Sequence, residues 1–195
     1  LSGWNRRCCR PRSVKARNVI SGNTGLGINI GTSGSVRDTI VRGNYIGTNR
    51  AGTAAVANSA GGINVGSAPG TRIGGTTAGA GNLISGNASS GISITAISHP
   101  AIDGTYNSVV EGNIIGLNAA GTAAIPNSIG VSVSNEDNRI GGNTAAARNV
   151  ISGNLTNGVS ISGALATNNT VAGNYIGTDV TGLVGLRNQN GVVIR

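Results

Sequence analysis

The chain has 195 residues, a formal charge of +8, 34 glycines, 25 asparagines and neither Phe nor Met. Because Gly and Asn oppose helix formation and only one Trp and three Tyr are present, this composition excludes a helical bundle and an aromatic-centred core. Six of the net positive charges lie within residues 1–17, so the main body is nearly neutral and we do not expect it to bind nucleic acid.

Residues 1–16 form a basic segment that shares nothing with the rest of the chain. We interpret it as a leader or tail; binding of nucleic acid or another anionic surface by this arm is a third functional hypothesis, below the two given later. Cys8 and Cys9 are adjacent, which is neither a disulfide framework nor a metal-ligand spacing. No apolar run approaches the roughly 18 residues of a membrane-spanning helix, so membrane insertion is not predicted.

Residues 17–195 consist of a repeat. The sequence Arg-Asn-Val-Ile-Ser-Gly-Asn occurs at 17–23 and 148–154, and 81–87 differs from it at two positions. A second motif, Gly-Asn-Tyr-Ile-Gly-Thr, occurs at 43–48 and 173–178, with a close variant at 112–117. The two motifs alternate, so each superrepeat of 61–69 residues contains two turns of chain.

Each turn contains three short apolar segments, and the first of them alternates apolar with small polar residues, as at Ile28 and Ile30. This period of two predicts a strand with one buried face. Stacking three strands per turn at about 4.8 Å gives an all-β fold, a parallel β-helix of about five turns. The third strand of every turn has Ile at its inward position: Ile20, Ile46, Ile84, Ile115, Ile151 and Ile176.

An asparagine precedes each third strand at the same position of the turn: Asn18, Asn44, Asn82, Asn113, Asn149 and Asn174. We predict that these residues occupy left-handed corners and that their amides bond to one another along the stack, as identical side chains do at strand spacing. Their role is therefore predicted to be structural.

These Asn corners, the Gly-Ile-x-Ile strands and the Asn-x-Ile-x-Gly-Asn segments resemble the right-handed parallel β-helix repeat proteins of the pectate-lyase-like fold superfamily, over residues 17–195. The resemblance implies right-handed coiling and an extracellular or cell-surface location, but no activity. The chain stops within or just after a strand at Val192–Ile194, so we expect a fragment of a longer solenoid, open to end-to-end or side-by-side self-association.

A regular insertion at 48–59 recurs at 117–128 and, more loosely, from 178 onward. We expect these alanine-rich loops to cover an apolar stripe at the outward positions of the third strands: Val19, Tyr45, Leu83, Ile114, Val150 and Tyr175. The alternative is that the stripe is a partner surface, or that Tyr45 and Tyr175 stack on sugar rings.

The best candidate site is an acidic edge. One insertion, at 95–107, occurs once and contains His99, Asp103 and Tyr106, while the corresponding corner of the next turn contains Glu136 and Asp137. Glu111 and Arg139 lie on nearby strands. Stacking is expected to bring the acids within a few strand spacings of one another, where carboxylates serve glycoside chemistry or bind calcium. A solvated, partly ion-paired edge is the plainer interpretation.

Two main hypotheses follow. The first is a noncatalytic extracellular scaffold or glycan-binding segment, with polysaccharide as the partner and no cofactor except the calcium named above. The alternative is a polysaccharide lyase or glycoside hydrolase that acts at the acidic edge. The sequence favours the first. The resemblance implies that such lyases need a basic residue, Arg or Lys, beside carboxylates; the only lysine, Lys15, lies outside the repeats, and Arg139 could take this role but no motif marks it.

Overall fold

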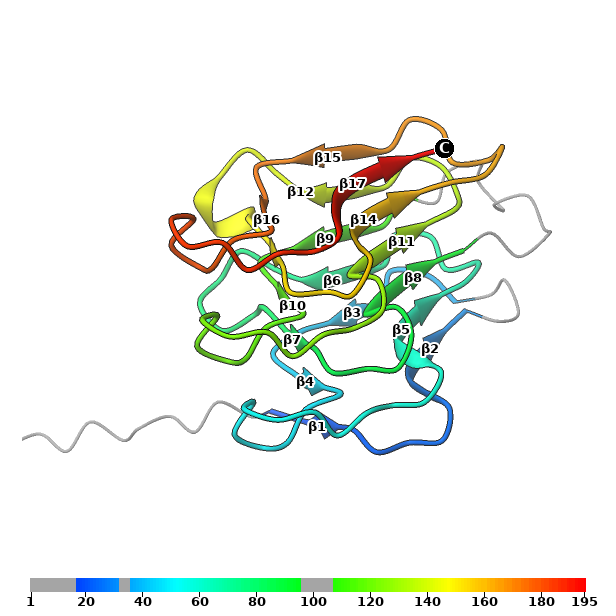
Figure 1. Ribbon diagram of the computed structural model, residues 1–195. Coiled ribbons are helices and arrows are strands. Elements are labelled where there is room, and N and C mark those ends of the chain that lie inside the picture. Colours follow the sequence, from blue (N-terminus) through cyan, green and yellow to red (C-terminus); the bar gives the residue numbers. More distant parts are fainter. Residues whose placement is uncertain (1–16, 32–35, 96–106) are drawn as a thin grey trace, which may run out of the picture.

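The computed structural model of the protein describes residues 17–31, 36–95 and 107–195 and is a right-handed parallel β-helix, as the sequence predicts (Figure 1). Within these ranges the chain forms seventeen short strands and one 3-10 turn, Ala145–Ala147. The strands form five complete turns of three and a sixth turn of two.

Each turn passes once through each of three parallel sheets. Sheet A contains β1 (Val19–Ile20), β4 (Tyr45–Ile46), β7 (Leu83–Ile84), β10 (Ile114–Ile115), β13 (Val150–Ile151) and β16 (Tyr175–Ile176). Sheet B contains β2 (Leu26–Ile30), β5 (Gly61–Val65), β8 (Ile92–Ile94), β11 (Val131–Val133), β14 (Asn157–Ile161) and β17 (Asn190–Ile194). Sheet C contains β3 (Ile40–Val41), β6 (Arg72–Gly74), β9 (Val109–Glu111), β12 (Arg139–Gly141) and β15 (Thr170–Ala172).

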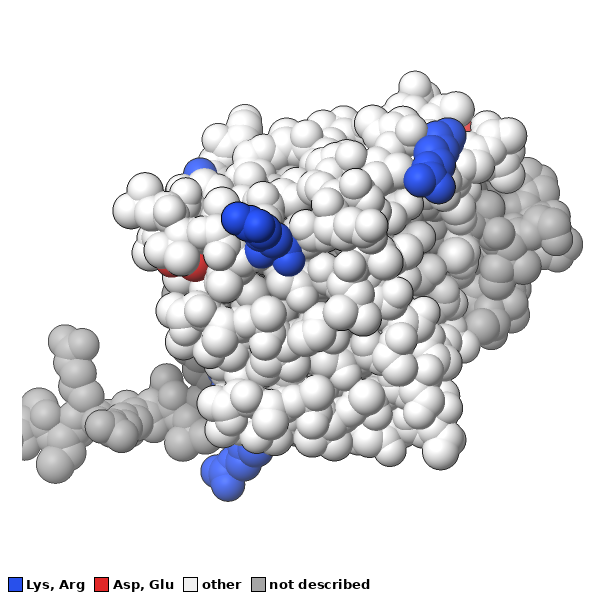
Figure 2. Space-filling view, in the orientation of Figure 1, with Lys and Arg blue, Asp and Glu red and all other residues white. Residues whose placement is uncertain are grey.

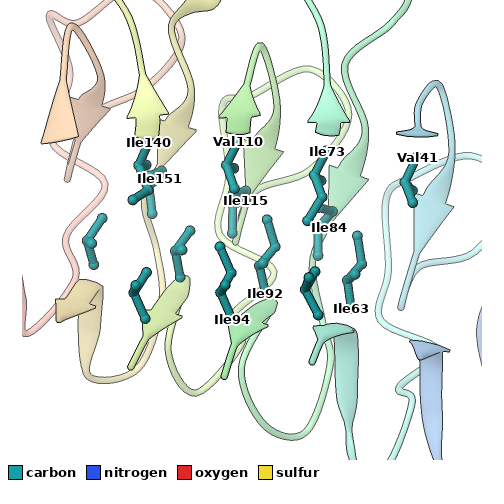
Figure 3. Packing of buried hydrophobic residues seen from close by; sticks show 14 of the residues in the cluster. Val41, Ile63, Ile73, Ile84, Ile92, Ile94, Val110, Ile115, Ile140 and Ile151 are labelled. Atoms are coloured by element: carbon teal, nitrogen blue, oxygen red, sulfur yellow. The ribbon is translucent and has the colours of Figure 1, made fainter. Parts of the chain in front are cut away.

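The core is a column of aliphatic side chains enclosed by the three sheets. Ile46, Ile84, Ile115 and Ile151 of sheet A pair in register and are fully buried, which confirms the predicted inward position. Figure 3 shows side chains of sheets B and C pointing into the same space. Each buried Ile contributes about 1.5–3 kcal/mol, and stacking like on like leaves few voids.

The predicted asparagine ladder is present at the corner between sheets C and A. Asn113 accepts hydrogen bonds from the backbone N–H and the Nδ2 of Asn82, at 3.0 and 2.9 Å. Its own Nδ2 donates to Asn149 Oδ1 at 3.0 Å and to the Ile73 carbonyl at 2.9 Å. The ladder therefore satisfies backbone groups that the corner would leave buried without partners.

The backbone of these corners differs from the prediction. The ladder asparagines do not have positive φ; instead the glycines that precede three of them, Gly43, Gly112 and Gly173, have φ between 67° and 72°. Glycine adopts the left-handed region without the steric cost of a Cβ, which leaves the asparagine free to turn its amide along the stack.

A second asparagine ladder lies at the corner between sheets A and B. Asn87 Nδ2 donates to Asn127 Oδ1 at 2.9 Å, and Asn127 Nδ2 donates to Asn154 Oδ1 at 3.0 Å. The series comprises Asn23, Asn58, Asn87, Asn127, Asn154 and Asn188. Sequence analysis missed it because a loop of about ten residues separates the strand from the asparagine in every second turn; the recurring Asn-Ser after that loop was the available signal.

The regular loops cover the middle of the outward stripe of sheet A, as expected, whereas Val19 at its first turn is 44% exposed. Each loop closes on itself through an antiparallel bridge, such as Thr48 with Ala55, and the Ala119 amide of the second loop donates to the Gly52 carbonyl of the first at 2.8 Å. Leu83 and Val150 are only 3% and 7% exposed under this cover. The stripe is therefore part of a second, outer apolar layer.

Candidate functional site

The hollow beside Glu111 arises from an alternation in the corners between sheets C and A. After β9 and β15 one glycine separates the strand from the ladder asparagine, and after β3 Arg42 and Gly43 do, whereas after β6 and β12 the longer corners 75–81 and 142–148 intervene. The two long corners belong to the turns on either side of β9. Glu111, the last residue of β9, therefore lies between two projecting loops.

Glu111 and Arg139 form an ion pair across adjacent turns. The pairing of Val109 with Arg139 places the arginine one turn further along the axis, and its Nη2 donates to Glu111 Oε2 at 2.9 Å. Its Nη1 donates to the Gly141 carbonyl. The side chains are 11% exposed for Glu111 and 38% for Arg139, so the carboxylate is well covered while the guanidinium reaches the surface.

This pair lines a hollow of about 520 Å³. Its polar side chains come from both long corners and from strands β9, β12 and β15: Thr76, Glu111, Arg139, Asn143, Thr144 and Thr170. The Thr144 hydroxyl accepts a hydrogen bond from the Ala147 amide at 3.3 Å, which shapes the rim by capping the 3-10 turn. The volume lies within the range of small-molecule sites.

The other described acids do not join this hollow. Glu136 and Asp137 are half-buried in the corner before β12, whereas Glu111 aligns with Gly141 at the end of that strand. Four residues separate Asp137 from Gly141 and five separate Glu136 from it, or about 10 Å or more along the sheet at about 3.3 Å per extended residue. Asp137 has φ of 60°, so its role in the corner is that of a left-handed residue. Of the acidic-edge residues that the structure describes, only Glu111 and Arg139 are brought together.

Three of the sequence-predicted site residues, His99, Asp103 and Tyr106, lie outside the described residues. Their relation to the hollow stays a prediction.

Tyr45 and Tyr175 do not present free ring faces for sugars. The Arg17 guanidinium carbon lies 3.8 Å from the Tyr45 ring centroid, and that of Arg148 lies 4.1 Å from the Tyr175 centroid. The loop glycines pack against the same rings, because a Cβ on Gly52 would meet Tyr45 at 2.9 Å. Each ring is thus held between an arginine and a loop. The repeat contained a signal for this arginine–tyrosine contact, because an Arg precedes the ladder asparagine in the turn before each of the two tyrosines.

The hollow has the chemistry of a polyol site. The Glu111 carboxylate accepts hydrogen bonds, the Arg139 guanidinium donates them, and the hydroxyls of Thr76, Thr144 and Thr170 do either. The ion pair leaves the site with no net charge.

No family model, curated protein or solved structure matched the chain when it was compared with each. Among the described residues, no three His, Cys, Asp or Glu side chains are grouped so as to hold a metal ion. The same part of the chain has no helix with the length and apolar character needed to cross a membrane.

Proposed function

We propose that the chain is a noncatalytic β-helix scaffold that binds neutral glycans in the hollow beside Glu111 and Arg139. The observation that carries this proposal is the covered carboxylate–guanidinium pair at the side of a hollow of about 520 Å³. Resemblance to pectate-lyase-like β-helix proteins, together with the scaffold role, supports a setting at the cell surface or outside the cell.

The charge balance selects the glycan class. Sugar hydroxyls both donate and accept, so they match a site with one carboxylate, one guanidinium and several hydroxyls. A uronic acid would bring a second carboxylate next to Glu111, whose charge is already matched by Arg139. Like charges that are close together and shielded from water repel, so acidic polysaccharides are disfavoured here.

The test is affinity electrophoresis of the full chain against neutral polysaccharides, such as a β-glucan, a xylan and a galactomannan, with polygalacturonate as the acidic member. We expect at least one neutral polymer to retard the protein. Glu111→Gln should raise the dissociation constant by about tenfold, because hydrogen bonds to a charged acceptor are replaced by weaker ones.

Glu136→Gln is the matched control, since it removes the same charge at the other end of the sheet C strands and should leave retardation unchanged. The unfolding midpoints of both variants are measured first, to confirm that they equal the midpoint of the unsubstituted chain. Retardation that survives Glu111→Gln would overturn the site. Release of reducing or unsaturated ends would overturn the noncatalytic assignment and favour a hydrolase or a lyase.

A further inference from the structure

The two-turn repeat places a second pair of side chains in the arrangement of Glu111 and Arg139. β3 and β6 pair with Val41 opposite Ile73, as β9 and β12 pair with Val110 opposite Ile140. Arg42 follows Val41 as Glu111 follows Val110, and Arg72 precedes Ile73 as Arg139 precedes Ile140. The corner that follows is also equivalent, with Gly74 at φ 90° and Gly141 at φ 88°.

At this second place both members are arginines. Arg72 occupies the position of Arg139, whose guanidinium reaches the residue one turn back at 2.9 Å. Arg42 occupies the position of Glu111. Both arginines are exposed, and no ion pair within the described ranges involves either. The register therefore places two arginines on adjacent turns, with like charges at the positions where the equivalent pair has opposite ones.

Nearby carboxylates do not neutralise this pair. Glu111 lies on the next turn, but its Oε2 bonds to Arg139 on the turn beyond. Asp38 lies in the corner before β3 and would contact a Cβ built on Gly70, two residues before Arg72. Among the described residues, neither Arg42 nor Arg72 thus has a carboxylate partner at ion-pair distance.

We propose that Arg42 and Arg72 form a binding site for a tetrahedral oxyanion, a phosphate or sulfate group, either as the free ion or as an ester. Two guanidinium forks supply enough N–H donors to bind several oxygens of one group at once. The exposed backbone and hydroxyls of the corner 75–81, which includes Thr76 and Thr77, border the same side. The corner 75–81 also borders the proposed glycan hollow, through Thr76, but the charged residues of the two sites differ and the oxyanion site does not depend on glycan binding.

The experiment follows the arginine Nε–H resonances of the full chain by NMR while sodium sulfate or phosphate is added at constant ionic strength. A site-resolved signal is needed because residues 1–16 contain five further basic side chains. We expect saturable shifts at Arg42 and Arg72. Arg42→Gln and Arg72→Gln should each raise the dissociation constant about tenfold, since each removes charge-assisted hydrogen bonds.

Arg50→Gln is the matched control, because it removes the same charge from an exposed loop of the sheet A flank and should leave binding unchanged. A sulfated and a phosphorylated monosaccharide separate ester from free ion, and acetate tests whether a tetrahedral group is required. Absence of saturable shifts at the two arginines, equal loss in Arg50→Gln, or equally tight acetate binding would each overturn the proposal.

Discussion

Asp179 begins the third regular loop, at the position that Asn49 and Asn118 hold in the first two. Its Oδ1 accepts from the Thr181 hydroxyl at 2.7 Å and from the backbone N–H groups of Thr181, Leu183 and Val184 at 3.0–3.4 Å. The hydrogen bond from the Thr181 hydroxyl, followed by those from the backbone, lowers the pKa of the Asp179 carboxyl. One acceptor thus organises the loop as a charged group here and as a neutral amide in its two counterparts.

This difference predicts acid sensitivity of the third loop alone. The pKa of the Asp179 carboxyl is lower in the folded state than in the unfolded chain. Its contribution to the stability of the folded loop is therefore complete above the pKa of the unfolded chain, near pH 4, and is lost as the pH falls through the folded-state pKa. We expect the Leu183 and Val184 amide resonances to shift in that acid range, while those of Thr53 and Thr122 stay constant. Asp179→Asn should abolish the shift; persistence of the shift would contradict the assignment.

The element-scale feature with the clearest energetic consequence is the ladder between sheets C and A. Each interior amide there links three consecutive turns, since it accepts from the turn before and donates to the turn after. Because Asn82 and Asn113 are 2% and 1% exposed, water cannot replace a missing partner. The ladder is therefore expected to act as a buried polar network in which a single loss leaves several groups unpaired.

Asn113→Ala tests this network. It removes the acceptor for Asn82 and two buried donors, so we expect a loss of at least about 2 kcal/mol in the free energy of unfolding, measured by urea titration. The matched change is Asn64→Ala, which removes the exposed bond from Asn64 Nδ2 to Asn29 Oδ1 and should cost about 0.5 kcal/mol or less. Similar costs for the two variants would count against the ladder as a source of stability.

At the scale of the whole molecule, stability follows position along the axis. Side chains that share one inward column range from Ile94, with no exposed surface, to Ile194, which is 74% exposed. Charges are also unevenly placed: Figure 2 shows few charged side chains on the face over β5, β8 and β11, where the outward residues are Asn64, Ser93 and Ser132. Middle and terminal turns therefore differ in burial far more than in sequence.

Amide hydrogen exchange should reveal this gradient, because each turn of a solenoid is stabilised by its neighbours. We expect the amides of β8 and β11 to exchange at least about tenfold more slowly than those of β17, although all three strands have the same alternating pattern. Mass spectrometry of peptides from each turn measures these exchange rates. Uniform protection along the axis would show that the solenoid opens in one cooperative step instead.

Much of this fold could be predicted from the sequence, because a column such as Ile84 and Ile115, or a ladder such as Asn82 and Asn113, is a local pattern repeated at a constant place in the turn. The second ladder was hidden because loops of unequal length shift its members in the sequence while strand pairing restores their register in space.

The site was less predictable. Glu111 was singled out with three other acids, Asp103, Glu136 and Asp137, and with Arg139, but the repeat pattern indicates only which turn each residue belongs to. Register and corner length, which arise when the turns stack, bring Glu111 to Arg139 and hold Asp137 at the other end of the strand. The sequence alone determined the β-helix and its core, because burial and hydrogen bonding repeat with the chain. Only the tertiary structure decided which charges meet, because contact between turns depends on where each strand ends.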